Sequence, residues 1–266
     1  MSHSPSLDRD APILLRDDAD GVCTLTLNRP AARNALSVAL MAALQQSLDL
    51  IAQDDSVKVV VIAANGPAFC AGHDLKEVRG LPREQHRPLF DQCSKLMTTV
   101  VHLPKPVIAK VHAMATAAGC QLVASCDLAY AADEAKFATP GVNIGLFCST
   151  PMVALSRAVG RKKAMEMLLS GRPISAAEAE AAGLINHAVP AADLDAAVAD
   201  MATLIASKSP LTLALGKEAF YRQVEMPLEA AYVYASEVMT RNMAAQDASE
   251  GIDAFLQKRP AQWRGC

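Results

Sequence analysis

The chain has 266 residues, a length that suits one globular domain, and 52% of them are hydrophobic, enough for a large core. The formal net charge of −3 comes from interspersed acidic and basic residues, so nucleic acid is not an expected partner. No apolar run reaches the roughly 18 to 20 residues of a membrane helix, which excludes a membrane-spanning protein. The first twelve residues, MSHSPSLDRDAP, carry no targeting signal. We therefore expect a cytoplasmic protein.

Seven cysteines are present, an odd number without paired spacing. Cys120 and Cys126 lie in an apolar run, which is typical of reduced, buried thiols and not of a disulfide framework. No CxxC or HxxxH pair occurs, so the sequence predicts no metal site.

The first half of the chain alternates strand-like and helix-like segments. Alternating apolar and polar residues predict a half-buried strand, and a β-branched apolar run predicts a strand covered on both faces. Strands separated by helices indicate a mainly parallel sheet with crossover connections. The predicted order is strand 22–27, helix 37–51, strand 57–63, helix 83–102, strand 106–112, a helix from about 118, and strand 127–131.

From about residue 152 the strand signals stop and helical patterns dominate. Ser175, with Glu178 three residues later, predicts a helix N-cap. The periodicity thus predicts an α/β layer followed by a helical layer, divided into a flexible segment 1–15, a core 16–200 and a helical region 201–266. The predicted helices are 161–170, 176–182, 191–207, 211–223 and 228–245.

Two loops of small residues carry the chemistry. The first, residues 66–75, follows the strand at 57–63, and its glycines let backbone approach a ligand closely. The second, residues 115–122, passes from a strand into a helix, whose first N–H groups are free to bind an oxyanion. Each loop alone is equally consistent with a tight turn between packed elements.

Together and in this order, the loops resemble the crotonase (enoyl-CoA hydratase/isomerase) family, and the similarity extends over nearly the whole chain. Among subgroups the chain is most similar to the enoyl-CoA hydratase domain-containing protein 3 type. The resemblance implies a ClpP/crotonase-like spiral of ββα units with a helical C-terminal trimerisation region. It also implies an acyl-CoA or enoyl-CoA ligand, no separate cofactor, and a homotrimer or a dimer of trimers. The matching segments are 28–36, 66–77, 105–131, 137–146, 159–186 and 255–263.

The resemblance also implies residue roles. The main-chain N–H groups of His73 and Ala118 would bind the thioester oxygen in an oxyanion hole. Arg33 would lie near the coenzyme A phosphates, with a solvated surface arginine as the alternative. The remaining substrate-binding positions would be Ala35, Ala71, Asp74, Leu75, Ala117, Pro140 and Leu146, and Phe255 and Lys258 would reach a neighbouring subunit's ligand.

The chain departs from a hydratase at both positions where the family carries water-activating glutamates, which are here Gln121 and Gly141. A positioned general acid or base supplies about 100- to 10,000-fold in rate, so we expect weak hydration. On the sequence alone, restoring both glutamates should raise hydration at least about 100-fold.

Other side chains could replace the glutamates only in part. The His73 imidazole titrates near neutral pH and is one candidate, with a solvent-facing ring as the alternative. Cys148 could line the acyl pocket, and a buried inert thiol is the favoured interpretation. The remaining polar residues that we considered are Glu77, Asp127, Asp133 and Ser149.

Three functional classes remain open. The chain is a thioester enzyme, a non-catalytic acyl-CoA binder or sensor, or an interaction protein that has lost its ligand. A fourth hypothesis is a different CoA-thioester reaction that uses a bound anion near Gly141, and the sequence supports it only in part. A dinucleotide-binding Rossmann enzyme and an α/β-hydrolase are excluded, because neither GxGxxG nor GxSxG occurs.

Overall fold

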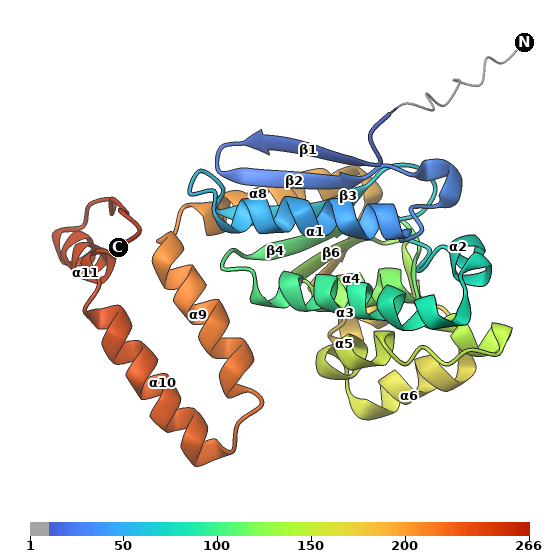
Figure 1. The fold of residues 1–266 in the computed structure, drawn as a ribbon. Coiled ribbons are helices and arrows are strands. Elements are labelled where there is room, and N and C mark those ends of the chain that lie inside the picture. The colour runs from blue at the N-terminus through green and yellow to red at the C-terminus, as the bar shows by residue number, and fades with distance from the viewer. Residues whose placement is uncertain (1–10) are drawn as a thin grey trace, which may run out of the picture.

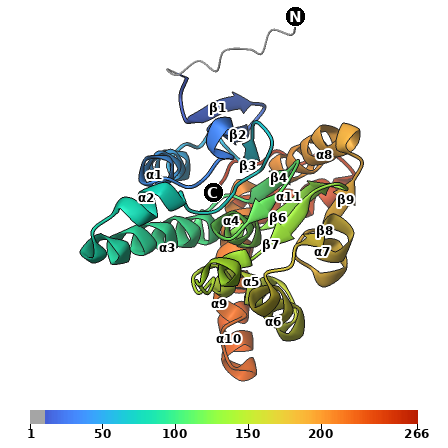
Figure 2. The ribbon, with the colours of Figure 1, turned by 90° about the vertical axis from the view of Figure 1, so that its right-hand side faces the viewer.

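The computed structural model describes residues 11–266 and contains two sheets (Figures 1 and 2). A six-stranded sheet has the order β1-β2-β3-β4-β6-β9, in which only β1 is antiparallel to its neighbour, and a small sheet has the order β5-β7-β8. The strands are β1 (Leu14–Ala19), β2 (Val22–Leu27), β3 (Val59–Ala64), β4 (Val107–Val111), β5 (Ala115–Thr116), β6 (Leu128–Ala132), β7 (Lys136–Ala138), β8 (Ile174–Ser175) and β9 (His187–Val189).

The central strand β3 shows why the sheet is covered on both faces. Because side chains alternate along a strand, Val60 and Ile62 face one side, and Val59 and Val61 face the other. The first pair packs into the main core with α1 and α3, and the second packs against α8. Burial on both faces explains the uninterrupted apolar run of β3.

Helices cover both faces of the large sheet and then extend the chain beyond it. Ser37 caps the first long helix by accepting from Leu40 N, and Ser175 and Glu178 form a capping box on α7. The helices are α1 (Val38–Ala52), α2 (Leu75–Gly80), α3 (His86–His102), α4 (Ala118–Ser125), α5 (Pro151–Ala158), α6 (Arg161–Ser170), α7 (Ala176–Ala182), α8 (Leu194–Ala206), α9 (Pro210–Gln223), α10 (Leu228–Met243) and α11 (Gln246–Gln257).

Most predicted elements are confirmed. Strand 22–27 and helices 161–170 and 176–182 have the predicted bounds, and the sheet is mainly parallel as expected. The prediction that strands stop near residue 152 was wrong, because β8 and β9 follow. These strands have only two and three residues, too short for a visible alternation. Helices α5 and α11 were also missed.

The predicted segment boundaries differ from the observed elements. Most of the segment 1–15 lies outside the described residues, but its last two residues, Leu14 and Leu15, already pair in β1. The boundary at 201 falls inside α8, and the separate helical region begins with α9. In the part of the chain that the structure describes, no helix is long and apolar enough to cross a membrane.

A buried ionic network attaches the C-terminal helices to the core. Helices α9 and α10 extend away from the sheet (Figure 1), and α9 carries Lys217. The Lys217 side chain is 7% exposed, and its ammonium donates to Asp127 Oδ2 at 2.7 Å and to the carbonyls of Val100 and Lys105. Tyr221 donates to the other carboxylate oxygen at 2.9 Å. Burial raises the pKa of Asp127 and lowers that of Lys217, and their mutual attraction opposes both shifts.

We predict that Lys217→Met destabilises the protein by about 3 to 5 kcal/mol, because it leaves the Asp127 carboxylate buried without its cation. The double change Asp127→Asn with Lys217→Met should cost less than Lys217→Met alone, because it removes both charges. Denaturant unfolding of both variants measures the difference. Equal stability of the wild type and Lys217→Met would contradict a role for this network in attaching α9.

Candidate functional site

The first small-residue loop is held by the segment that follows β2. Leu36 N donates to Gly72 O at 2.7 Å, and Asp74 N donates to Leu36 O at 3.1 Å, which makes Leu36 and His73 a parallel bridge pair. Because amides alternate in direction along an extended segment, the His73 N–H points away from Leu36. Its direction is therefore set by the two hydrogen bonds on either side of it.

The second loop turns sharply into α4. Ala117 has φ +50° and ψ −118°, a conformation that non-glycine residues rarely adopt, and its N–H donates to Ala138 O at 2.9 Å. Ala118, the first helical residue, is fully buried. Its N–H has no acceptor within the helix, and it lies at the positive end of the helix dipole.

The two loops touch, which brings both predicted donors to one place. A Cβ at Gly72 would lie 2.8 Å from Ala117 Cβ and 3.3 Å from Ala118 N, and Gly72 also has φ +87°. A Cβ at Gly119 would lie 2.2 Å from Cys70 O. Only glycine permits either approach. The amides of His73 and Ala118 therefore belong to backbone segments in direct contact, the arrangement that two donors to one oxygen require.

The His73 imidazole is turned into the protein. It lies edge-on to Phe90 of α3, with ring centroids 5.4 Å apart, and its Nε2 is buried without a hydrogen-bond partner. Burial lowers the pKa of His73. Burial therefore favours the neutral form of the ring, and the alternative of a fully solvent-facing ring is wrong, because Nε2 is shielded from solvent.

Two further polar groups nearby lack partners. Gln121 lies one helical turn after Ala118 and is 4% exposed, and Thr139 follows Ala138 and is fully buried. Gln121 Oε1 and Thr139 Oγ1 make no hydrogen bond. Native proteins seldom leave such atoms unpaired, so these two favour a ligand that carries hydrogen-bonding groups.

Gly141 lies in the 3₁₀ turn Pro140–Ile144, and there is no room for a side chain there. A Cβ would lie 2.7 Å from Leu146 O and 3.0 Å from Cys148 Sγ. The turn closes through Leu146 N, which donates to Gly141 O at 2.9 Å. A glutamate at this position would therefore have to displace the backbone of the 146–148 segment.

The residues expected on the coenzyme A side surround the first loop. Arg33 is exposed, and its carbonyl accepts from Ala71 N at 3.0 Å. Ala35 is 8% exposed and Leu75 is 54% exposed.

The Asp74 side chain is already engaged. Its Oδ2 accepts from Arg29 Nη2 at 3.0 Å, and its Oδ1 accepts from Lys76 N as the cap of α2. Burial acts to raise the pKa of Asp74, but the Arg29 guanidinium and the backbone N–H groups outweigh it and lower the pKa.

Two of the predicted residues do not join this site. Phe255 lies on α11 and is 82% exposed, and Lys258 follows that helix. Figure 1 shows α11 and α2, which follows the first loop, at opposite ends of the molecule. Phe255 and Lys258 are therefore remote from the loops of their own chain.

The side chains considered as replacements for the glutamates are occupied or turned away. Glu77 accepts from Val38 N at 2.9 Å, and Asp127 belongs to the Lys217 network. Asp133 and Ser149 are exposed. Cys148 is 7% exposed, and burial raises the pKa of its thiol. The most suitable remaining group is therefore the neutral His73 ring.

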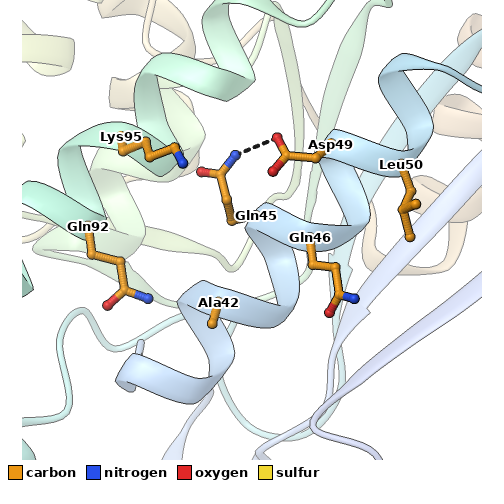
Figure 3. A pocket seen from close by; sticks show the side chains of 7 residues that line it. All are labelled: Ala42, Gln45, Gln46, Asp49, Leu50, Gln92 and Lys95. Carbon is orange, nitrogen blue, oxygen red and sulfur yellow. Dashed lines mark hydrogen bonds between the residues drawn. The ribbon is translucent and has the colours of Figure 1, made fainter.

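A surface groove of about 460 Å³ lies between α1 and α3 (Figure 3). Five polar side chains line it together with Ala42 and Leu50, and Gln45 Nε2 donates to Asp49 Oδ1 at 2.8 Å within it. It contains none of the predicted site residues, so it is separate from the two loops. Among residues 11–266, no three His, Cys, Asp or Glu side chains are arranged to hold a metal ion.

The sequence analysis missed two residues of this site. Arg29 lies inside the matched segment 28–36 and Thr139 lies inside the matched segment 137–146, but neither appears in the predicted set. Nothing local reveals their contacts, because Thr139 lies about 20 residues from Ala118, and Arg29 pairs with a residue 45 positions away.

Comparison with known proteins identifies the family of the chain. Residues 17–266 match the family model described as Enoyl-CoA hydratase/isomerase. The chain is 49% identical to mouse "Enoyl-CoA hydratase domain-containing protein 3, mitochondrial" over 92% of this chain and 82% of that protein.

Two solved structures superpose closely. A Mycobacterium smegmatis enoyl-CoA hydratase has a TM-score of 0.93 at 53% identity, covering 95% of this chain and 99% of that one. Human enoyl Coenzyme A hydratase domain-containing protein 3 has a TM-score of 0.93 at 48% identity, covering 95% of this chain and all of that one. The fold is therefore the expected crotonase fold, and the chain belongs to the enoyl-CoA hydratase/isomerase family.

Proposed function

We propose that the chain binds the thioester of an acyl-CoA or enoyl-CoA, whose carbonyl oxygen accepts hydrogen bonds from His73 N–H and Ala118 N–H. The observation that carries the proposal is the contact of Gly72 with Ala117 and Ala118. Two preorganised donors stabilise the negative charge that develops on a thioester oxygen, and losing one typically costs about 100- to 1000-fold in rate. Both donors are main-chain groups, so neither depends on the side chain present.

The chemistry of this site is thioester enolate stabilisation with weak hydration. Gln121 can hold a water or an acyl substituent by hydrogen bonding, but it cannot take up a proton. Gly141 offers no side chain, and Leu146 O and Cys148 Sγ occupy the space for one. A neutral His73 is the side chain best suited to accept a proton near the thioester. The second candidate function is binding of the thioester without turnover. It is favoured by the absence of a carboxylate at both Gln121 and Gly141.

Coenzyme A enters this proposal as part of the ligand, with no separate cofactor. Arg33, exposed beside the first loop, supplies a cation for its phosphates, and Ala71 and Leu75 border the same surface. A cytoplasmic location stays a prediction, because the mouse relative is named mitochondrial.

We predict that calorimetry with acetyl-, crotonyl- and octanoyl-CoA gives a dissociation constant of about 1 to 100 μM for at least one of them. Gly72→Ala should weaken that binding at least about 10-fold, because the added Cβ drives the two donor loops apart. Gly80→Ala is the matched control, since a Cβ there meets nothing within 4 Å. No heat from any thioester, or equal binding by both variants, would refute the proposed oxyanion hole.

The structure changes the expected outcome of restoring the glutamates. Gln121→Glu buries a carboxylate without a cation, and Gly141→Glu must displace residues 146–148. We therefore predict that neither the single changes nor the double change raises crotonyl-CoA hydration by the roughly 100-fold that one general acid–base contribution supplies. Loss of the enoyl-thioester absorbance measures the rate, and thermal melting checks folding. A folded double variant that exceeds that increase would show that the 146–148 backbone moves readily.

We also propose a homotrimer, or a dimer of trimers, in which Phe255 and Lys258 reach a neighbouring subunit's ligand. The support is the apolar surface of the C-terminal helices, which a lone chain leaves in water. Its exposed members are Phe220, Val224, Leu228, Tyr232, Val233, Met239, Met243, Ile252, Phe255 and Leu256.

Light scattering should give a mass of at least three times the 28.1 kDa of one chain. The double change Leu228→Glu with Tyr232→Glu places two charges on one face of α10 and should reduce that mass, because a charge buried at an interface without a partner is unfavourable. Leu50→Glu, at a position of α1 that is 59% exposed, is the control and should leave the mass unchanged. A wild-type mass of 28 kDa across concentrations would contradict the trimer.

A further inference from the structure

The guanidinium of Arg29 joins two segments that meet beside the first loop. Arg29 follows β2, and its Nη1 donates to Ala35 O while its Nη2 donates to Asp74 Oδ2 at 3.0 Å. The side chains of Arg29 and Asp74 are 22% and 15% exposed. Limited contact with water makes this pair stronger than an ordinary surface ion pair.

The two acceptors of Arg29 flank the Leu36–His73 bridge. Ala35 precedes Leu36 and Asp74 follows His73, so one planar guanidinium spans both strands of that bridge. Such a span across two acceptors uses the fixed fork of arginine, which a lysine ammonium does not reproduce.

Asp74 has little freedom to move. One carboxylate oxygen accepts from Arg29, the other caps α2 through Lys76 N, and its own N–H donates to Leu36 O. The peptide unit that carries the His73 N–H is therefore held through its own carbonyl, Gly72 O, and the next peptide unit is held through Asp74 N.

The backbone of Arg29 is also held in place by hydrogen bonds. Arg29 N donates to Asn34 Oδ1 at 2.8 Å, and Asn34, fully buried, donates to the carbonyls of Asn65 and Ala68. These last two residues frame the start of the first loop. A continuous set of hydrogen bonds thus links Arg29 to both ends of that loop.

We propose that Arg29 is a positioning residue that acts through Asp74 to hold the His73 N–H at the angle required to polarise the thioester carbonyl. This inference rests on the proposed function, because it concerns the same oxyanion hole. Hydrogen bonds weaken steeply as their angle departs from linearity, so a small rotation of residues 72–74 reduces the effect on the carbonyl. A purely structural ion pair would stabilise the fold and leave a bound carbonyl unchanged.

The test compares Arg29→Met and Arg29→Lys with a control, Arg16→Met. Arg16 also pairs with two acidic side chains, Asp18 and Asp54, but it lies on β1, away from the loops. The first readout is amide hydrogen exchange of the peptide 70–77 in the ligand-free protein. The second is the ¹³C carbonyl shift of saturating acetyl-CoA labelled at the thioester carbon.

Arg29→Met should speed exchange in peptide 70–77 at least about 10-fold and reduce the bound carbonyl shift by about half, because the loop loses its clamp. Arg29→Lys should lie between it and the wild type, since an ammonium reaches Asp74 but does not span both acceptors. Arg16→Met should change neither readout.

The inference is overturned if Arg29→Met shows wild-type hydrogen exchange and a wild-type carbonyl shift. If Arg29→Met does not fold, a wild-type carbonyl shift in Arg29→Lys overturns it instead. A third outcome has a different meaning: Arg29→Met exchanges faster in peptide 70–77, but the wild type leaves the ¹³C shift of the thioester carbonyl at the value of free acetyl-CoA. It would retain the clamp on the loop and refute the oxyanion hole, so the two failures are distinguishable.

Discussion

The contact between Gly72 and the start of α4 is the constraint on which the rest of this site depends. Two backbone segments from different parts of the sheet approach so closely that a single methyl group would separate them. The strained turn at Ala117 and the bridge between Leu36 and His73 both serve this approach, because they orient the two amides at its edge. Strain of this kind persists only where surrounding structure enforces it, and here the hydrogen bond from Ala117 N to Ala138 O and the packing of buried Ala118 do so.

The proposed site has two candidate main-chain donors but no carboxylate at positions 121 and 141. Main-chain donors survive sequence change, because any residue except proline supplies an N–H group. Proton transfer depends on side chains, and Gln121 and Gly141 supply no carboxylate. At Gly141 the loss is built into the backbone, since Leu146 O lies where a side chain would begin. The family fold therefore does not by itself imply hydratase activity.

The C-terminal helices combine an internal anchor with an uncovered apolar surface. Lys217 and Asp127 attach α9 to its own core by a buried ion pair, while α10 and α11 leave large apolar side chains in water. The anchor fixes where these helices begin and so carries Phe255 away from the loops of its own chain (Figure 1).

The sequence by itself determined the α/β order and the two small-residue loops, because periodicity and turn residues are local signals. It also revealed that both glutamates are absent. Only the tertiary structure decided that β9 completes the sheet, that Gly141 has no room for a side chain, that His73 Nε2 is shielded from solvent, and that Arg29 pairs with Asp74. Each of these depends on contact between residues far apart in the chain, and no local pattern specifies which distant segments pack together.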